Sequence, residues 1–313
     1  MVKIKLSIPE SFFKEETRCG YTVSRKMKEI WAVQLDLFAE FDRVCRKYGI
    51  IYIASGGTML GAVRHHGYIP WDDDIDLMLT RDQYDKLCQV APNEFKHPYF
   101  FQTEKTDVGF MRGFARLRNS ETTGIQKQEI SYHLTYNQGI FIDIFPMDNI
   151  PNDKSKYERQ CKKYSFYNLL FSYLNVIETG IVNDEVSLLE RSIRKLLSSS
   201  LGIISKKMRL CDHYYEKAQR ECMRYNCEKS EYISLLSFQM DNLKHAIRNS
   251  DMDHIIYVDF EFLKMPIIAN YDEHLKLKYG KYLTPLQNPN YHGEIIFDTN
   301  HSYKDYFALH TSN

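Results

Sequence analysis

The sequence lacks net charge and long apolar runs, and each absence excludes a class of protein. Its 313 residues carry 41 Lys and Arg against 41 Asp and Glu, so the formal charge is zero. Proteins that bind long nucleic acids neutralise phosphates with a basic surface, so this balance argues against a nucleic-acid partner. No run reaches the 18 apolar residues typical of a membrane-spanning helix, and the first residues have no apolar core of signal-peptide length.

Paired cysteines and tryptophan are also scarce. The seven cysteines are odd in number and scattered, and no Cys-x-x-Cys pair occurs. This spacing fits neither a disulfide framework nor a zinc ribbon, so we expect a cytoplasmic protein with reduced thiols. Only 2 Trp accompany 23 Tyr and 18 Phe, an aromatic excess that composition alone assigns to no site.

Apolar periodicity predicts an α/β (α+β) fold with a mixed sheet. Apolar residues recur every three or four positions over 23–48, which indicates an amphipathic helix, and Gly49 follows as a stop signal. Short apolar, β-branched runs indicate strands. The predicted strands are 50–54, 75–79, 114–118, 139–145 and 255–258, and the other predicted helices are 58–66, 80–88 and 271–279.

The character of the sequence changes at residues 151–153, after which the pattern is mostly helical to about Arg224. We therefore expect three parts: a catalytic core with an N-terminal helix (1–150), a helical region inserted or appended (151–250), and a C-terminal segment that packs back on the core (251–313).

Four carboxylates fall within five residues at one point of the chain. They are Asp72, Asp73, Asp74 and Asp76, and the last runs directly into an apolar strand. Because strand side chains alternate, Asp74 and Asp76 project to one side, and Asp72 joins them if the strand begins early. Like charges this close repel unless a cation lies between them, and Mg²⁺ and Mn²⁺ prefer carboxylate ligands. We favour a metal site over the alternative, a solvated acidic loop.

A glycine turn precedes this cluster. Ser55, Gly56 and Gly57 lie between a predicted strand and a predicted helix, where free backbone N–H groups can bind a phosphate. A simple tight turn is the alternative. Arg64 and His65 follow on the helix, and Arg can bind phosphate oxygens with two hydrogen bonds.

A fifth carboxylate, Asp143, interrupts a run of Ile and Phe in residues 139–146. A charge in such a strand is rare without a partner or a metal. We expect Asp143 to face the same metal site; the alternative is a buried aspartate that caps a neighbouring turn.

Three segments resemble the LicD family of phosphotransferases, which is related to the fukutin proteins. Residues 56–77, GGTMLGAVRHHGYIPWDDDIDL, look like the family signature, residues 139–151, GIFIDIFPMDNIP, look like its second block, and residues 271–280, YDEHLKLKYG, resemble a third. The resemblance implies a nucleotidyltransferase-like core and an enzyme that transfers a phospho-alcohol from a CDP-activated donor to a sugar hydroxyl. For bacterial members it implies CDP-choline as the donor and, as the acceptor, a cell-surface glycan (lipopolysaccharide, capsule or teichoic acid) or its lipid-linked precursor.

The resemblance also implies roles for individual residues. Asp72, Asp74 and Asp76, with Asp143, match the metal-binding carboxylates. Ser55, Gly56, Gly57, Thr58, Arg64 and His65 fall on the positions expected near the donor nucleotide and its phosphates. On this reading Mg²⁺ (or Mn²⁺) held by Asp74 and Asp76 bridges the donor diphosphate, and Asp143 accepts the proton of the acceptor hydroxyl.

Several alternatives stay open at this point. The donor could carry ethanolamine, glycerol or ribitol, and a true nucleotidyltransferase would release pyrophosphate instead of CMP. A non-catalytic glycan-binding scaffold ranks lower because every expected carboxylate is present. Trp71 either contacts the substrate or fixes the loop as a core residue.

The aromatic stretch 166–177 and the basic residues after it have two interpretations. The default is the core of a helical region with a solvated charged face. The alternative is peripheral contact with the inner face of a membrane that carries a lipid-linked acceptor. The basic residues are Arg191, Arg194, Lys195, Lys206, Lys207 and Arg209.

Overall fold

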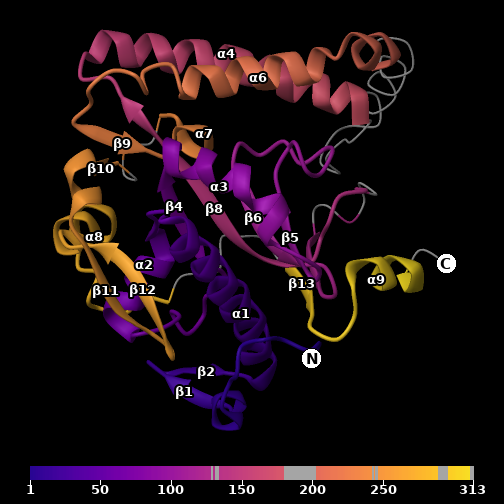
Figure 1. Cartoon of the computed structure of the whole chain (residues 1–313), viewed down its shortest axis with the longest axis vertical. Coiled ribbons are helices and arrows are strands. Elements are labelled where there is room, and N and C mark those ends of the chain that lie inside the picture. Colours follow the sequence, from indigo (N-terminus) through magenta and orange to yellow (C-terminus); the bar gives the residue numbers. More distant parts are fainter. Residues whose placement is uncertain are drawn as a thin grey trace.

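The computed structural model describes residues 1–127, 130, 134–179, 202–241, 243, 246–287 and 295–310. A long N-terminal helix, α1 (Arg25–Tyr48), packs against its core (Figure 1). The Ser24 side chain caps its start by accepting a hydrogen bond from the Met27 N–H at 3.2 Å. Gly49 ends it in the left-handed conformation, with φ +60°. Trp31 is among the residues that bury its apolar face in the core. The helix predicted from the apolar spacing is confirmed.

Within the described part of the chain, seven strands form a mixed central sheet, which confirms the predicted fold class. Its centre is β8, which pairs in parallel with β4 and antiparallel with β6 and β9. The remaining neighbours are β3 beside β4, β5 beside β6 and β10 beside β9. The strands are β3 (Ile53–Ala54), β4 (Asp76–Thr80), β5 (Tyr99–Gln102), β6 (Ala115–Asn119), β8 (Ile140–Ile150), β9 (Tyr232–Ser234) and β10 (Ile247–Arg248).

Several predicted elements differ in extent from the structure. The strand predicted for 139–145 continues as β8 to Ile150, and the one predicted for 255–258 continues to Phe260. Only residues 53–54 of the strand predicted for 50–54 pair with a neighbour, as β3. The Ile50 N–H instead donates to the Cys45 carbonyl in the last turn of α1, and the Ile51 N–H donates to the Gln83 side chain. The helix predicted for 80–88 continues as α3 (Arg81–Glu94). The helix predicted for 58–66 is α2 (Gly56–His65), and the one predicted for 271–279 is α8 (Tyr271–Tyr279).

Short elements surround the sheet. Two hairpins, β1 (Glu16–Arg18) with β2 (Tyr21–Val23) and β11 (Ile255–Phe260) with β12 (Leu263–Ile268), lie beside the core, and β13 (Ile295–Asp298) pairs with β7 (Thr123–Gln126). The other short elements are η1 (Glu10–Phe13), α7 (Leu236–Gln239), η4 (Asn249–Asp253) and α9 (Tyr303–His310).

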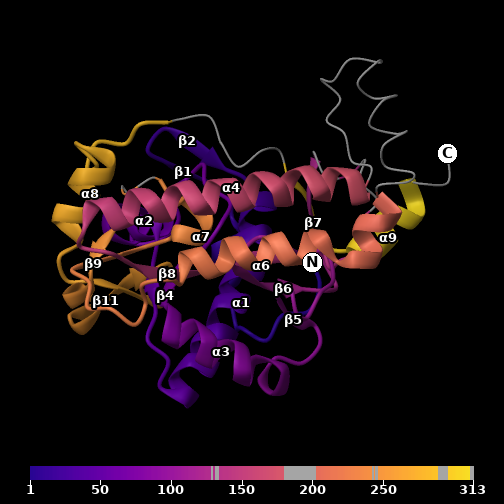
Figure 2. The same ribbon diagram turned by 90° about the horizontal axis from the view of Figure 1, so that it is seen from above.

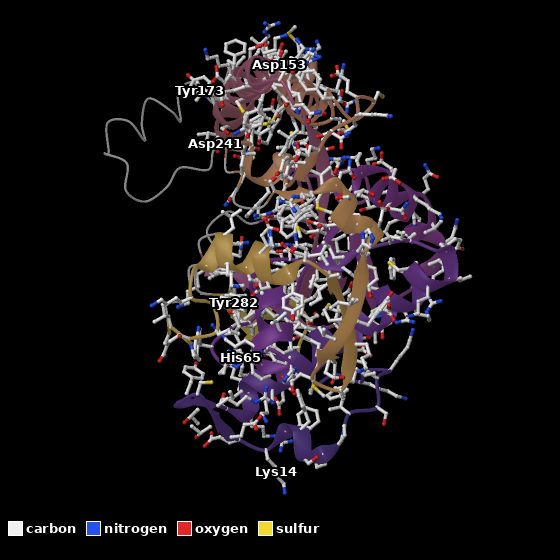
Figure 3. The ribbon with its side chains drawn as sticks, turned by 90° about the vertical axis from the view of Figure 1, so that its left-hand side faces the viewer. Lys14, His65, Asp153, Tyr173, Asp241 and Tyr282 are labelled. Atoms are coloured by element: carbon white, nitrogen blue, oxygen red, sulfur yellow. The ribbon has the colours of Figure 1, made fainter. Side chains whose placement is uncertain are left out.

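The helices α4 (Lys154–Thr179) and α6 (Leu210–Cys222) lie side by side as an outer layer, seen along the top of Figure 1 and from above in Figure 2. They fall in the predicted helical region, although β9 and β10, also from residues 151–250, join the central sheet. Phe166, Leu169 and Tyr173 are exposed on α4, and Figure 3 shows Tyr173 in this layer. Arg191, Arg194 and Lys195 lie outside the described residues. Among the described helices, none combines the length and apolarity required to cross a membrane.

Candidate active site

One cavity of about 610 Å³ brings together most of the residues that the sequence singles out. Its walls come from the start of α2, the loop before β4, and strands β4, β6 and β8, with further side chains from α7, α8 and β13. The predicted site residues among its lining are Ser55, Gly56, Gly57, Trp71, Asp72, Asp74, Asp76 and Asp143.

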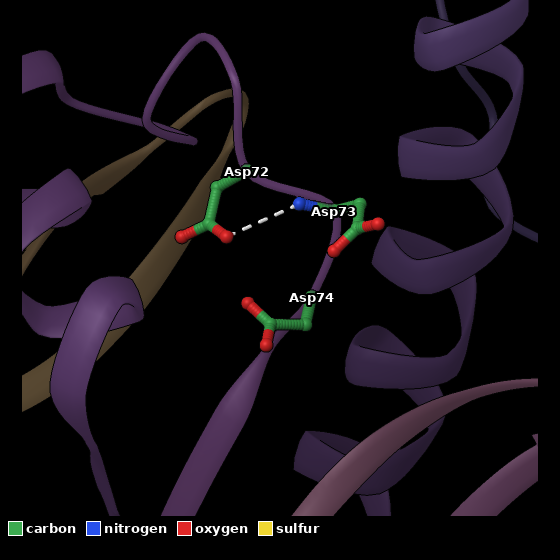
Figure 4. A group of neighbouring side chains, drawn as sticks. All are labelled: Asp72, Asp73 and Asp74. Carbon is green, nitrogen blue, oxygen red and sulfur yellow. Dashed lines mark hydrogen bonds between the residues drawn. The ribbon is translucent and has the colours of Figure 1, made fainter. Parts of the chain in front are cut away.

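Two carboxylates of the cavity come from residues 72–74, the acidic loop, which lies outside the sheet. Because β4 begins only at Asp76, Asp72 and Asp74 reach the cavity from the preceding loop and not from alternate positions of a strand. Figure 4 shows both carboxylates on the same side of this loop, with Asp73 on the other side, nearer to α1. One carboxylate oxygen from each of these three residues lies within 4.8 Å of the others, and the Asp73 N–H donates to Asp72 Oδ1 at 3.3 Å.

Two side chains of α1 hold the main chain of this loop. Trp31 Nε1 donates to the Asp72 carbonyl at 2.9 Å, and Gln34 Nε2 donates to the Asp73 carbonyl at 2.6 Å. Trp31 also stacks on Tyr68, with ring centroids 4.5 Å apart and planes at 1°. The long helix therefore positions the acidic loop through buried, directional bonds.

Strand pairing places Asp143 beside Asp76. These residues are partners in the parallel register of β4 and β8, so their side chains leave the same face of the sheet. The Asp76 N–H donates to Thr58 Oγ1 at 2.8 Å, which ties β4 to α2. Asp143 accepts two hydrogen bonds from Arg116, Nε to Oδ1 at 2.6 Å and Nη2 to Oδ2 at 3.4 Å. The guanidinium carbon of Arg116 also lies 3.7 Å from the Phe141 ring centroid.

The glycine turn fits tightly against the acidic loop. Gly56 has φ +49°, a conformation that L side chains rarely adopt. A Cβ atom on Gly57 would lie only 2.7 Å from Asp72 Oδ2, so the missing side chain is what allows the carboxylate to approach. The first N–H groups of α2 lack acceptors within the helix and favour an anion.

The structure does not bring Arg64 and His65 into the cavity lining. Arg64 donates to the Tyr282 carbonyl at 2.7 Å and to His65 Nε2 at 2.8 Å, and Figure 3 shows His65 and Tyr282 close together. Burial, followed by the Arg64 charge, lowers the pKa of His65 to about 4, so this imidazole is neutral near pH 7. Trp71 lines the cavity and packs edge-on against Tyr21, with centroids 6.0 Å apart.

Several residues of the lining were not identified from the sequence. The partly buried Lys278, from α8, is one of them, and burial lowers the pKa of its ammonium to about 8 against the opposing effect of Asp76. Lys278 Nζ and Asp76 Oδ2 lie 3.5 and 3.7 Å from the same point, the position of a Cβ on Gly56. The resemblance of residues 271–280 to a family block was the only signal, and it does not say which side chains face inward. Also unassigned were Arg112, Phe114, Arg116, Gln126, Phe238 and Gln239.

The donor set fits a hard divalent cation. The loop and the paired strands offer several carboxylate oxygens in one cavity, and Mg²⁺ and Mn²⁺ prefer ligands of this type. Asp72 and Asp74 belong to the group of three aspartates whose oxygens lie within 4.8 Å of one another. Asp76 and Asp143 line the same cavity, and their part in holding the cation stays a prediction.

Comparison with known proteins gives matches over part and over most of the chain. The family model described as LicD/FKTN/FKRP, nucleotidyltransferase domain, matches residues 49–169. Lipopolysaccharide cholinephosphotransferase LicD of Haemophilus influenzae is 26% identical over 261 residues, which cover 82% of this chain and 91% of that protein. Over residues 49–169 the chain is thus similar to the LicD family.

Two shorter matches are the uncharacterized proteins RP689 of Rickettsia prowazekii, 39% identical over 56 residues, and RT0683 of Rickettsia typhi, 38% identical over 60 residues. Each covers about a fifth of both chains, 18% and 21% for the first and 19% and 19% for the second. The range that matches the LicD family model contains the glycine turn and all four cavity aspartates, whereas Phe238 and Lys278 lie beyond it.

Proposed function

We propose that this chain is a LicD-family transferase that moves phosphocholine from CDP-choline to a sugar hydroxyl of a lipopolysaccharide or another cell-surface glycan, and releases CMP. The observation that carries the proposal is the meeting of Asp72, Asp74, Asp76 and Asp143 with the N-terminus of α2 in one cavity. The printed activity of the Haemophilus influenzae relative supports phosphocholine as the transferred group and lipopolysaccharide as the acceptor.

Several residues of the chain bind the donor diphosphate. A bound Mg²⁺ or Mn²⁺ would neutralise charge on the donor diphosphate. The N–H groups of Gly56 and Gly57 bind diphosphate oxygens at the start of α2, and the Lys278 ammonium, which lies next to Gly56, attracts the same anion.

The transfer step needs a proton acceptor. The acceptor oxygen forms a bond to the phosphorus that carries choline, and the bond from that phosphorus to the CMP oxygen breaks, so CMP leaves with the electron pair. Asp143 accepts the hydroxyl proton. Its oxygens already accept hydrogen bonds from Arg116, but each carboxylate oxygen has two lone pairs, so one remains for the incoming proton.

The direct test is product analysis. The protein is incubated with CDP-choline, CDP-ethanolamine, CDP-glycerol or CDP-ribitol, with Mg²⁺, Mn²⁺ or EDTA, and with lipopolysaccharide as the acceptor. We expect metal-dependent release of CMP, fastest with CDP-choline. Release of pyrophosphate from a nucleoside triphosphate, without CMP from any CDP-alcohol, would support a true nucleotidyltransferase instead.

Variants test the site itself. Asp74→Asn or Asp76→Asn is expected to lower metal-dependent CMP release by about 100-fold or more, because each removes a charged oxygen ligand. Asp253→Asn is the matched control, since Asp253 is exposed and not part of the cavity lining. Near-normal rates in the Asp74 and Asp76 variants would contradict the site assignment.

A further inference from the structure

The part of the cavity lining that β8 forms, called the floor below, is charged at one residue and aromatic at the next residue on the same face. Phe141, Asp143 and Phe145 all line the cavity, as expected for alternate residues on one face of a strand. Asp143 stands beside Asp76 and Arg116, whereas Phe145, about 7 Å further along the strand, stands among aromatic side chains. The acidic loop precedes β4 and therefore joins the floor at the opposite end.

Three phenylalanines form the aromatic end. Ring centroids are 4.6 Å apart for Phe114 and Phe145, 5.1 Å for Phe145 and Phe238, and 6.1 Å for Phe114 and Phe238. Phe114 and Phe145 are buried, but Phe238, from α7, is 47% exposed although it lines the cavity. An apolar ring is therefore presented at the mouth of a polar site.

Polar groups that can bind hydroxyls line the cavity together with these rings. They are Arg112, Gln126 and Gln239; Gln239 follows Phe238 on α7, and Arg112 Nη2 donates to Gln126 Oε1 at 3.2 Å. Side-chain amides offer both donors and acceptors, and a guanidinium offers five donors. An aromatic face with amides and a guanidinium around it matches a sugar ring, which has an apolar C–H face and hydroxyls at its edge.

The charges argue against the choline headgroup at this end. The guanidinium carbon of Arg116 lies 5.7 Å from the Phe114 ring centroid and 3.7 Å from that of Phe141, and Arg112 adds a second positive charge. A quaternary ammonium ion binds an open aromatic face, whereas the Arg116 guanidinium, itself paired with Asp143, already lies over the rings of Phe114 and Phe141.

We propose that Phe114, Phe145 and Phe238, with Arg112, Gln126 and Gln239, form the subsite for the acceptor sugar. This inference rests on the proposed function and adds to it the place of the second substrate. A sugar ring that lies against Phe238 and Phe145 directs a hydroxyl toward Asp143, two residues back on the same face of β8. The donor diphosphate occupies the acidic end.

Phe238 is the residue to change, because it is half exposed and its removal leaves the buried pair Phe114 and Phe145 in the core. We expect Phe238→Ala to raise the KM for the acceptor by about tenfold, with a much smaller change in the KM for CDP-choline. Phe238→Tyr, which keeps the ring, should retain most of the acceptor affinity. Phe166→Ala is the matched control, since Phe166 is a similarly exposed phenylalanine of α4 outside the cavity lining.

Binding without turnover provides a second readout. Saturation-transfer NMR with the deacylated lipopolysaccharide oligosaccharide of Haemophilus influenzae, in the absence of donor, should show transfer to sugar protons in the wild type and weaker transfer in Phe238→Ala. Equal transfer in both proteins, or a Phe238→Ala effect that falls on the KM for CDP-choline, would overturn the acceptor subsite while leaving the proposed function intact. If the wild type releases CMP from none of the CDP-alcohols, the proposed function fails, and the NMR comparison still decides whether this wall binds sugar.

Discussion

Lys278 brings a positive charge into a cavity whose other ionisable groups include four aspartates. Its ammonium can bind an anion that sits between it and the acidic loop, which is the place assigned to the donor diphosphate. We expect Lys278→Met to raise the KM for CDP-choline about 10- to 100-fold, the usual range for the loss of one hydrogen bond between charged groups. Lys278→Arg should recover part of this loss, and initial rates of CMP release measure both.

Lys276→Met is the control for this experiment. Lys276 lies on the same helix but points to solvent, where it pairs with Asp272 at 2.6 Å, and an exposed pair of this kind contributes little. The role of Lys278 is contradicted if the two methionine variants have the same KM for CDP-choline.

The carboxylates could be predicted from the sequence and Lys278 could not. Four aspartates within five residues, before an apolar strand, are unusual enough to indicate chemistry, and Asp143 is recognisable as a lone charge in a run of Ile and Phe. A single lysine in a charged helix carries no such signal. Neighbours such as Lys276 have the same local pattern, and only the packing of α8 against α2 distinguishes them.

The helix α1 packs into the core and also holds the main chain of the acidic loop in place. Trp31→Phe would keep an aromatic ring against Tyr68 but remove part of the indole together with the N–H whose hydrogen bond the Asp72 carbonyl accepts. We expect a loss of about 1–3 kcal/mol in the free energy of unfolding, because the carbonyl loses this donor and the smaller ring fills less of the core. Urea denaturation measures the stability, and Mn²⁺ titration followed by EPR should show weaker metal binding, because the acidic loop is held less firmly.

Phe38→Leu separates the two effects. Phe38 is buried on the same helix, is 1% exposed, and is not part of the cavity lining. Its substitution should cost about 1–2 kcal/mol of stability and leave Mn²⁺ affinity as in the wild type. Equal losses of metal affinity in both variants would mean that Trp31 acts through stability alone.

The sequence predicts where helices and strands lie better than it predicts which residues they contact. The spacing of Trp31, Leu35 and Phe38 is sufficient to predict the helix. The hydrogen bond from Trp31 to a carbonyl 41 residues away is not, because backbone acceptors have no sequence pattern. For the same reason short strands such as β10 and β13 were missed: two to four residues carry no periodicity, and their partners lie far along the chain.

His274 links the stability of the whole chain to pH. This histidine of α8 is 7% exposed, and burial, assisted by the Lys278 charge, lowers its pKa to about 4. Since the pKa of an unfolded histidine is about 6.5, the unfolded chain binds the extra proton between pH 6.5 and 4 and the folded chain does not. Stability therefore falls as the pH is lowered through this window, by a total of about 3 kcal/mol.

Urea denaturation at pH 7 and pH 4.5 tests this linkage. The loss of stability on acidification should be smaller by about 2 kcal/mol in His274→Gln than in the wild type. His213→Gln, which changes an exposed histidine of α6, should behave like the wild type. An identical acid dependence in all three proteins would exclude His274 as the source.

The arrangement of the whole molecule was only partly predictable. The sheet was predicted from the strand and helix patterns before residue 151, and the helical layer from the change of pattern at that residue. The return of β9 and β10 to the sheet did not, because residues 232–234 and 247–248 follow a helical stretch and are too short to indicate a strand by themselves. The three predicted parts of the chain remain a prediction, and the cavity draws side chains from residues 55 to 295.

That spread along the chain has a consequence during protein synthesis. When β8 has left the ribosome, every aspartate of the cavity is already present, but α8, which carries Lys278, has not been made. A product of premature termination before Tyr271 would thus hold the full cluster of negative charge without the ammonium that faces it. Arg112 and Arg116 are made with the aspartates, but Lys278 joins the cavity only when about the last seventh of the chain arrives, so the proposed competence to bind an anionic donor marks a nearly finished polypeptide.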